Sequence, residues 1–339
     1  MTESAVFFSR CRPQESNPID LVLKERRVFI GYPAFRIDVE PRRGHLRETI
    51  VDLRCSDEEW EKLRPSFDKN QKKQYQQNRN FIQSIERGAI ALVPRPDRGV
   101  VYAGRVVAPF ELIDNPPWGD AYLAFRRDHG LKVEDEFGHL GDVAQCCEVD
   151  QFRPIPFPLI PAWIRRSLLG RSTYGQIWPL SVLDLKPYPV LDRLLVDPRR
   201  EELPWTDNAI EVERRLVDAV GPNTFEHLCI ALLQLEHPEH IWSHVGGSGD
   251  GGVDGVGAAN SGEVVGLLQC KWAYSGEEVV VASSISERPI RQILAALLHP
   301  PSVPRRENVE FWSRSDIASL IIRHASKLPI ALSLRIRAA

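Results

Sequence analysis

The pattern of apolar and polar positions differs between the two halves of the chain. In the first half, short β-rich runs alternate with turn-forming residues, and the clearest runs are GAIALVPRP and VVYAGRVVAPFEL. They flank the short turn Asp97-Arg98-Gly99, so together they predict a β-hairpin. Residues 1–185 are therefore expected to form a β-rich domain, and the proline-rich stretch 186–205 a linker with a short helix inside.

Residues 206–339 show the mixed periodicities of an α/β domain. A first helix is predicted over 206–220, because apolar residues recur there at helical spacing and Gly-Pro follows. Thr206 is its expected N-cap, and Ile210 and Val217 are expected to face the core.

A second helix is predicted to begin at Asn223 or Thr224, because four apolar residues then recur at i, i+3, i+4 and i+7. These residues are Phe225, Leu228, Cys229 and Leu232. The remaining expected elements are a strand at 241–245, a hairpin around Asn260-Ser261-Gly262, a helix at 289–298, a strand at 309–313, a helix at 315–327 and a strand at 330–336. This order of elements predicts an α/β layer.

The amino-acid composition limits which binding partners and which cellular compartment are expected for the protein. The 339 residues include 43 Lys and Arg against 46 Asp and Glu, a net charge of -3, so nucleic acid would have to be held by local basic patches. The six cysteines form no CxxC pair, which argues against a zinc knuckle or a secreted disulfide framework. No apolar run approaches the ~18–20 residues that span a bilayer, and the start lacks the apolar region of a signal peptide. We therefore expect a cytoplasmic protein without a membrane partner.

The segment GGSGDGGVDG, with LLQCKW after it, carries the strongest chemical signal. Asp254 begins an extended run, and Gln269 and Lys271 lie two apart on the next strand, so both face one side. The turn at Asn260 folds the second strand back, which brings a carboxylate, an amide and an ammonium together. Hard oxygen ligands suit Mg²⁺ or Mn²⁺, and we expect Asp254, Gln269 and the Cys270 backbone carbonyl to supply them. With Lys271 stabilising the phosphate charge, this set favours metal-assisted phosphodiester hydrolysis.

These motifs resemble a known family. FEHL, GGSGDGGVDG and QCKW are similar to the Mrr family of restriction endonucleases, within the PD-(D/E)xK superfamily and its variant with Gln in place of the usual acid. The resemblance covers roughly residues 223–339 and implies a restriction-endonuclease-like α/β fold. By position it implies that Asp254, Gln269 and Lys271 are catalytic, and that Glu226 matches an acid on the first helix of the domain. The end of the chain departs from the pattern, since relatives close with a further strand and helix.

Two other readings of short motifs are weaker. Gly247, Gly249 and Gly252 also spell GxGxxG, but a dinucleotide-binding turn would open a helix directly, and glycine-rich, non-helical sequence follows instead. Cys146 and Cys147 could form a redox pair, although adjacent buried thiols are the commoner arrangement.

His237, His240 and His244 fall within eight residues, which raises the alternative of a zinc site. The segment spans a helix end and a strand start, so the rings need not converge. Glu226 lies at the edge of an apolar helix face, and an ordinary surface glutamate is the alternative to a catalytic one.

The N-terminal hairpin, followed by PAWIRR and GRSTYGQI, resembles the PUA-like, EVE-related domains that precede Mrr-type nucleases in some bacterial defence proteins. Gly88-Ala89 stands where those domains have Gly-Asp. The resemblance implies recognition of a modified or flipped base in an aromatic pocket. Tyr102, Trp163, Arg165 and Arg166 are the candidate DNA-binding residues, with a core or solvated role as the alternative for each.

The sequence thus predicts a divalent-metal-dependent DNA endonuclease in bacterial defence against foreign or modified DNA. A homodimer is expected, because cutting both strands at one site needs two active sites. Two alternatives stay open. One is a catalytically weak DNA-binding module, in which neutral Gln269 marks lost metal affinity; the other is a nuclease gated by a second messenger at the N-terminal domain.

Overall fold

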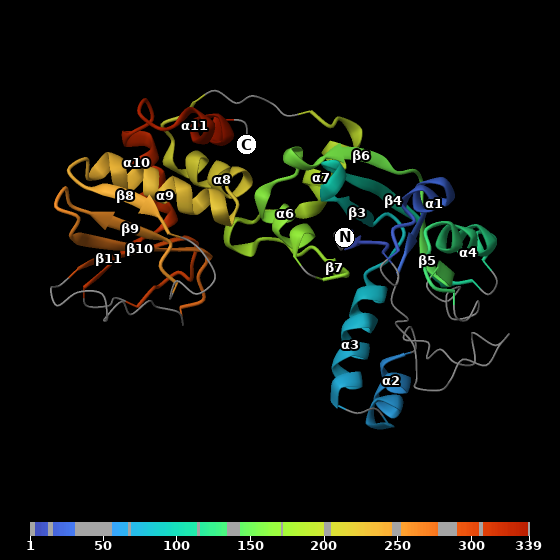
Figure 1. Ribbon diagram of the computed structural model, residues 1–339. Coiled ribbons are helices and arrows are strands. Elements are labelled where there is room, and N and C mark those ends of the chain that lie inside the picture. The colour runs from blue at the N-terminus through green and yellow to red at the C-terminus, as the bar shows by residue number, and fades with distance from the viewer. Residues whose placement is uncertain are drawn as a thin grey trace. The chain divides into compact units, whose positions relative to one another are not determined.

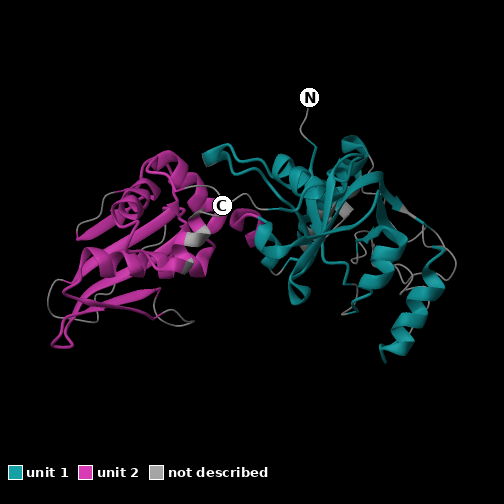
Figure 2. Cartoon of the chain, turned by 90° about the horizontal axis from the view of Figure 1, so that it is seen from above, with its two compact units in different colours: residues 1–160, 167–199 teal, residues 161–166, 200–339 magenta. Residues whose placement is uncertain are grey.

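The computed structural model describes residues 4–12, 16–30, 56–66, 69–113, 116–133, 143–170, 172–199, 205–245, 252–276, 290–304 and 308–337. The chain is mixed α/β and divides into two compact units, coloured separately in Figure 2. The first unit consists of residues 1–160 and 167–199, and the second of residues 161–166 and 200–339. The expected linker, 186–205, therefore begins within the first unit, where it contains helix α7 (Pro187–Val196).

The first unit contains a seven-stranded mixed sheet within its described residues, in the order β2-β5-β4-β3-β1-β7, with β6 paired to β4. Its strands are β1 (Val6–Ser9), β2 (Arg27–Phe29), β3 (Ile90–Arg95), β4 (Val100–Leu112), β5 (Gln145–Val149), β6 (Arg153–Pro156) and β7 (Tyr174–Gln176). Its helices besides α7 are α1 (Ile19–Glu25), α2 (Asp57–Leu63), α3 (Lys69–Gln83), α4 (Gly119–Asp128) and the C-terminal part of α6 (Ala162–Leu169). Figure 1 labels these elements except β1 and β2.

The predicted hairpin is confirmed as β3 and β4, which pair antiparallel around the left-handed Gly99. Ser56 and Glu59 form a reciprocal capping box at the start of α2. Strand β2 pairs antiparallel with β5.

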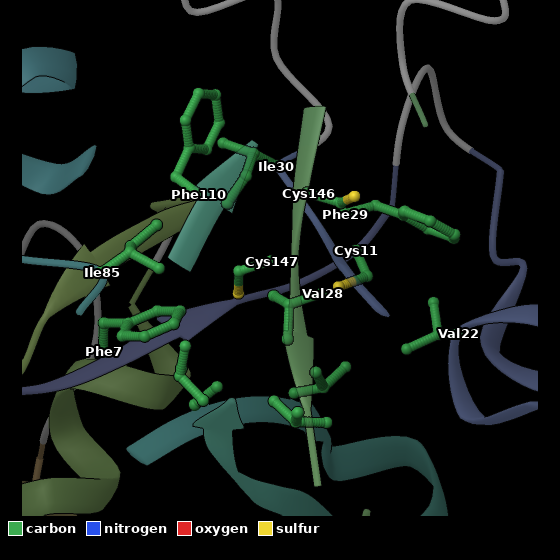
Figure 3. Packing of buried hydrophobic residues seen from close by; sticks show 14 of the residues in the cluster. Phe7, Cys11, Val22, Val28, Phe29, Ile30, Ile85, Phe110, Cys146 and Cys147 are labelled. Atoms are coloured by element: carbon green, nitrogen blue, oxygen red, sulfur yellow. The ribbon is translucent and has the colours of Figure 1, made fainter. Parts of the chain in front are cut away.

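The core of the first unit is apolar on both sides of the sheet. Figure 3 shows Phe7, Val28 and Phe29 in one cluster with the thiols of Cys11, Cys146 and Cys147. Burial raises the pKa of the Cys146 thiol to about 12 and that of Cys147 well above its ordinary range. Both cysteines are free and fully buried, which favours a packing role over redox chemistry.

The second unit has a five-stranded mixed sheet within its described residues, in the order β12-β11-β10-β9-β8. Its strands are β8 (Ile241–His244), β9 (Gly255–Ala258), β10 (Val264–Ala273), β11 (Arg291–Leu298) and β12 (Val309–Trp312). Its helices are α8 (Ala209–Ala219), α9 (Pro222–Glu236), α10 (Arg314–Arg323) and α11 (Ile330–Arg337). β8, β9 and β10 form an antiparallel meander, and β10, β11 and β12 run parallel. Helix α9 contacts β8 and β10 and so covers one face of this sheet (Figure 1).

Two expected elements of this unit are wrong. The helix expected over 289–298 is strand β11, buried between β10 and β12, and its run ILAALL is apolar because both faces are covered. Periodicity cannot separate such a run from a buried helix. The final strand expected over 330–336 is helix α11, which packs on α8, and seven residues are too few for their spacing to decide.

Two helix starts also differ from expectation. Asn208, not Thr206, caps α8 by accepting a hydrogen bond from the Glu211 amide, which places Ile210 on the outer side of the first turn, 80% exposed. Gly221 is the N-cap of α9, and Pro222 occupies the first helical position, which its fixed φ favours. The four apolar residues predicted on α9 are all buried, as expected.

Candidate active site

Asp254 lies where strand β9 meets the middle of β10. Its amide donates to the Leu268 carbonyl at 2.9 Å, and its carboxylate Oδ2 accepts a hydrogen bond from the Cys270 amide at 2.6 Å. Gly255, the next residue, pairs with Leu268, and a Cβ there would meet Ile230 of α9 and Leu268 at 3.3 Å. The close approach of α9 therefore favours glycine after Asp254, because a larger residue would push the Ile230 and Leu268 side chains aside by a few tenths of an ångström. The carboxylate is fixed against the strand that carries the QxK sequence.

Gln269 and Lys271 lie on β10 with their side chains on the face opposite α9. Leu268 points toward α9, and alternation along the strand then turns Gln269 to the other face, together with Lys271 two residues later. Gln269 is 7% exposed, and Lys271 is half-buried. Because Asp254 bonds the amide between them, the carboxylate, the amide side chain and the ammonium all belong to one short stretch of β10. The predicted spacing of the three residues along the hairpin is therefore present.

The Cys270 side chain points away from Gln269 and Lys271, toward Cys229 of α9. Burial raises the pKa of its thiol well above the ordinary range, and Cys229 and the carboxylates of Asp254 and Glu226 act in the same direction. The thiol therefore stays protonated at neutral pH. What Cys270 offers a hard cation is its backbone carbonyl, as the sequence predicts, rather than its sulfur.

Glu226 lies near the N-terminus of α9, just after its first turn, and faces β8. Its Oε2 lies 2.8 Å from Nε2 of His244, whose ring stacks on His227 with centroids 4.7 Å apart. His244 pairs with Gly255, the residue after Asp254. Glu226 is thus near the centre, within electrostatic reach of the Cys270 thiol, but on the α9 face of the sheet rather than the face of Gln269 and Lys271.

His237, His240 and His244, the three histidines considered as a zinc site, do not converge on one point. His237 and His240 lie near each other, with ring centroids 6.2 Å apart, whereas His244 pairs with Glu226. Within the described part of the chain, no group of three or more His, Cys, Asp and Glu side chains has the arrangement of a metal site. A cation at the QxK strand would therefore depend on the carboxylate of Asp254 together with the amide of Gln269 and a backbone carbonyl. These are hard oxygen donors of the kind that Mg²⁺ accepts.

The candidate DNA-binding residues of the N-terminal half are dispersed. Tyr102, on β4, is half-buried against the core of the first unit. Trp163 is 6% exposed and its Nε1 donates to Asp218 of α8 at 2.9 Å. The Arg166 guanidinium lies over the Trp272 ring, 5.0 Å from its centroid.

These contacts place Trp163 and Arg166 in the same compact unit as the QxK strand. Trp272 directly follows Lys271, and its Nε1 donates to the Val220 carbonyl at 2.7 Å. Arg165 is half-buried in the same helix. The first turn of α6 is therefore part of the unit that carries Asp254, which spacing along the sequence could not reveal.

Two further features near the site were missed from sequence. The Trp242 ring lies over Gly257 and Gly266, where an added Cβ would approach ring atoms to 2.8 and 2.6 Å. Two glycines on paired strands opposite one tryptophan are a usable signal for such packing. The pairing of Glu226 with His244 joins residues 18 apart on different elements, and no local pattern indicates it.

Within the described residues, no helix combines the length and apolar character needed to cross a membrane. Comparison of the chain with curated proteins and with solved structures found no significant match. Residues 217–321, which include α9 and strands β8 to β12, match the family model of the Mrr catalytic domain, described as restriction endonuclease. The part of the chain that holds Glu226, Asp254, Gln269 and Lys271 is thus similar to a restriction-type endonuclease domain that acts on DNA.

Proposed function

We propose that the protein is a divalent-metal-dependent endonuclease that hydrolyses DNA phosphodiester bonds. The observation that carries the proposal is the Asp254 carboxylate bonded to the Cys270 amide, between Gln269 and Lys271, inside a segment that matches a restriction endonuclease domain. The arrangement resembles that expected of the PD-(D/E)xK nucleases, in the variant with Gln in place of the second acid.

Each residue has a role that its position permits. Asp254 and Gln269, with the Cys270 carbonyl, would hold Mg²⁺ or Mn²⁺, and the bound ion would supply charge neutralisation at the scissile phosphate. The Lys271 ammonium lies two residues from Gln269 on the same face of β10, where it can donate to a phosphate oxygen as negative charge develops. Water attacks the phosphorus, and the bond to the leaving oxygen breaks, with a proton passing to that oxygen.

Glu226 enters this proposal as an auxiliary acid held by His244. Because it lies on the α9 face, it would act at the end of β9 beside Asp254 rather than beside Lys271. Its alternative role is to pair with His244 and fix α9 against β8. Glu226→Gln retains a hydrogen-bond acceptor and so distinguishes the two roles. If Glu226 is a catalytic acid, the variant should lose most of the cleavage rate. If Glu226 only packs α9 against β8, the cleavage rate should stay close to that of the wild type.

We further propose a biological setting. The endonuclease would act in the cytoplasm as a homodimer in bacterial defence, with the first unit, including Tyr102 of β4, selecting foreign or modified DNA. The resemblance of this half to PUA-like domains supports base reading. Sequence-independent phosphate contacts, including those of Arg165, would add salt-dependent affinity.

The test is cleavage of supercoiled plasmid by the full chain at fixed salt, with Mg²⁺ or with a chelator, on unmodified DNA and on DNA with modified bases. The proposal expects nicked or linear products only with the metal. Tight binding without cleavage in any metal would support the DNA-binding module. Cleavage that appears only after a cyclic nucleotide is added would support the second-messenger alternative.

A further inference from the structure

A cavity of about 470 Å³ lies beside the candidate active site, on the side of β11 and β12. Among the residues that line it are Tyr274, Leu294, His299 and Phe311. Its volume falls in the range of sites that take small organic ligands, roughly 300–1,000 Å³. It belongs wholly to the second unit, and no step of the reaction proposed above uses it.

The cavity lies at the carboxyl ends of three parallel strands. Tyr274 is the first residue after β10, His299 the first after β11, and Ser313 the first after β12. β10 pairs parallel with β11, and β11 with β12, so these three ends meet at one edge of the sheet.

The strand register connects the cavity to the catalytic strand. Gln269 is the direct neighbour of Leu294, and Leu294 is the direct neighbour of Phe311. Paired residues project to the same face, so these three form one row across the sheet, in which adjacent strands lie about 4.8 Å apart. Lys271 belongs to the next row, beside Ala296. A DNA strand whose phosphate reaches Lys271 therefore has the cavity as its immediate neighbour.

The walls of the cavity suit a flat aromatic ligand. The Tyr274 and Phe311 rings lie 6.3 Å apart at 39°, and the His299 ring meets Phe311 edge-on at 5.3 Å and 88°. Leu294, 4% exposed, is at the base. The buried Tyr274 hydroxyl and the half-buried His299 imidazole, whose Nδ1 lies 2.9 Å from the Pro300 carbonyl, add hydrogen-bonding groups to the lining. Aromatic walls with a few polar groups are how proteins hold a nucleobase outside its stack.

We propose that this cavity receives one base of the DNA substrate, unstacked beside the phosphate that is cleaved. The inference rests on the proposed nuclease function for the presence of DNA at β10, but the cavity itself does not depend on metal or on catalysis. A base stacked on the half-buried Phe311 ring within the cavity fixes the sugar and phosphate attached to it. The scissile phosphate is thereby positioned over Lys271, and bases that unstack easily are favoured.

The first experiment needs neither metal nor cleavage. The full chain is titrated with the four deoxynucleosides in the presence of a chelator, and binding is followed by ligand-observed NMR. Variants Phe311→Leu and His299→Ala are compared with Ile241→Ala, a matched control on β8, at the opposite edge of the same sheet, where the side chain is 58% exposed. Thermal unfolding establishes that each variant is folded.

The expected result is weak binding by the wild type and by Ile241→Ala, with an affinity lowered about tenfold or more in Phe311→Leu, because base–aromatic stacking is lost. His299→Ala, which leaves Phe311 in place, is expected to weaken binding less and to serve if Phe311→Leu does not fold. Equal binding by the wild type and both cavity variants would overturn the proposal, and so would no binding by the wild type.

The second experiment uses duplexes with 2-aminopurine, whose fluorescence rises when the base leaves the stack, at successive positions around a mapped cleavage position. A rise at one position, reduced in Phe311→Leu, is expected on binding without metal. A uniform signal at all positions would contradict base insertion. Nucleoside binding without Mg²⁺-dependent cleavage would refute the proposed nuclease function but support the assignment of the cavity. Mg²⁺-dependent cleavage without nucleoside binding would support the nuclease function but refute the assignment of the cavity.

Discussion

Asp254 serves both the fold and the proposed chemistry, so its two simplest substitutions should behave differently. The carboxylate accepts the Cys270 amide at 2.6 Å in a half-buried position. Hydrogen bonds to charged groups contribute about 1.5–3 kcal/mol to stability. Asp254→Ala removes this bond and leaves the amide without its acceptor, so the free energy of unfolding should fall by about that amount. For a unit of this size, each kcal/mol lowers Tm by roughly 2–4 °C.

Asp254→Asn separates the two roles. Its amide oxygen can still accept from the Cys270 amide, and the bond becomes neutral, worth about 0.5–1.5 kcal/mol. The variant should therefore unfold closer to the wild type than Asp254→Ala does. Loss of the negative ligand should remove several kcal/mol of transition-state stabilisation, and each 1.36 kcal/mol is tenfold in rate. Plasmid cleavage by both variants should fall by at least about a hundredfold.

The assay is thermal unfolding by circular dichroism beside plasmid cleavage under identical buffer and salt. Asp254→Asn that cleaves at the wild-type rate would refute the catalytic assignment. Asp254→Ala with the Tm of the wild type would refute the structural role derived from the Cys270 contact.

Substitutions at three further positions test neighbouring parts of the account. Gln269→Ala should impair cleavage, and Gln269→Glu should retain activity or shift the preferred metal; a fully active Gln269→Ala at low millimolar Mg²⁺ would remove this side chain from the site. Lys271→Ala should inactivate and Lys271→Arg recover little, since a planar guanidinium is not a compact charge, while binding by filter assay stays intact. Weak binding with normal cleavage would make Lys271 a phosphate contact only. Gly266→Ala should destabilise by about 1–3 kcal/mol in urea unfolding, because a Cβ would lie 2.6 Å from the Trp242 ring; an unchanged midpoint would mean that the ring moves freely.

The site was predictable where its geometry is local. Asp254, Gln269 and Lys271 are joined by one tight hairpin, and a turn signal with strand alternation is enough to place them. The face on which Glu226 lies was not predictable, because it depends on how α9 crosses the sheet and on a contact with β8. The same holds for Trp163, whose partner Asp218 is 55 residues away.

The fold was predictable where a turn signal separates two β-rich runs, and the prediction failed where an apolar run has no such signal. The hairpin of β3 and β4 has a clear turn between β-rich runs. The run ILAALL of β11 is wholly apolar because both of its faces are buried between parallel neighbours, so only its tertiary surroundings distinguish it from a helix. The cavity beside Gln269 follows from that correction, since a helix at 289–298 would have placed no row of side chains from Gln269 to Phe311.

The most direct test of the central claim is single-turnover cleavage of an end-labelled duplex by the full chain and by Lys271→Ala, purified in parallel. Mg²⁺ is added to both preparations, and the products are resolved by length. Metal-dependent cleavage by the wild type, with loss of at least about a hundredfold in Lys271→Ala while DNA binding is unchanged, is the predicted result. Equal cleavage by the two preparations, or none by the wild type on any modified or unmodified duplex, would contradict the assignment of β10 as the catalytic strand.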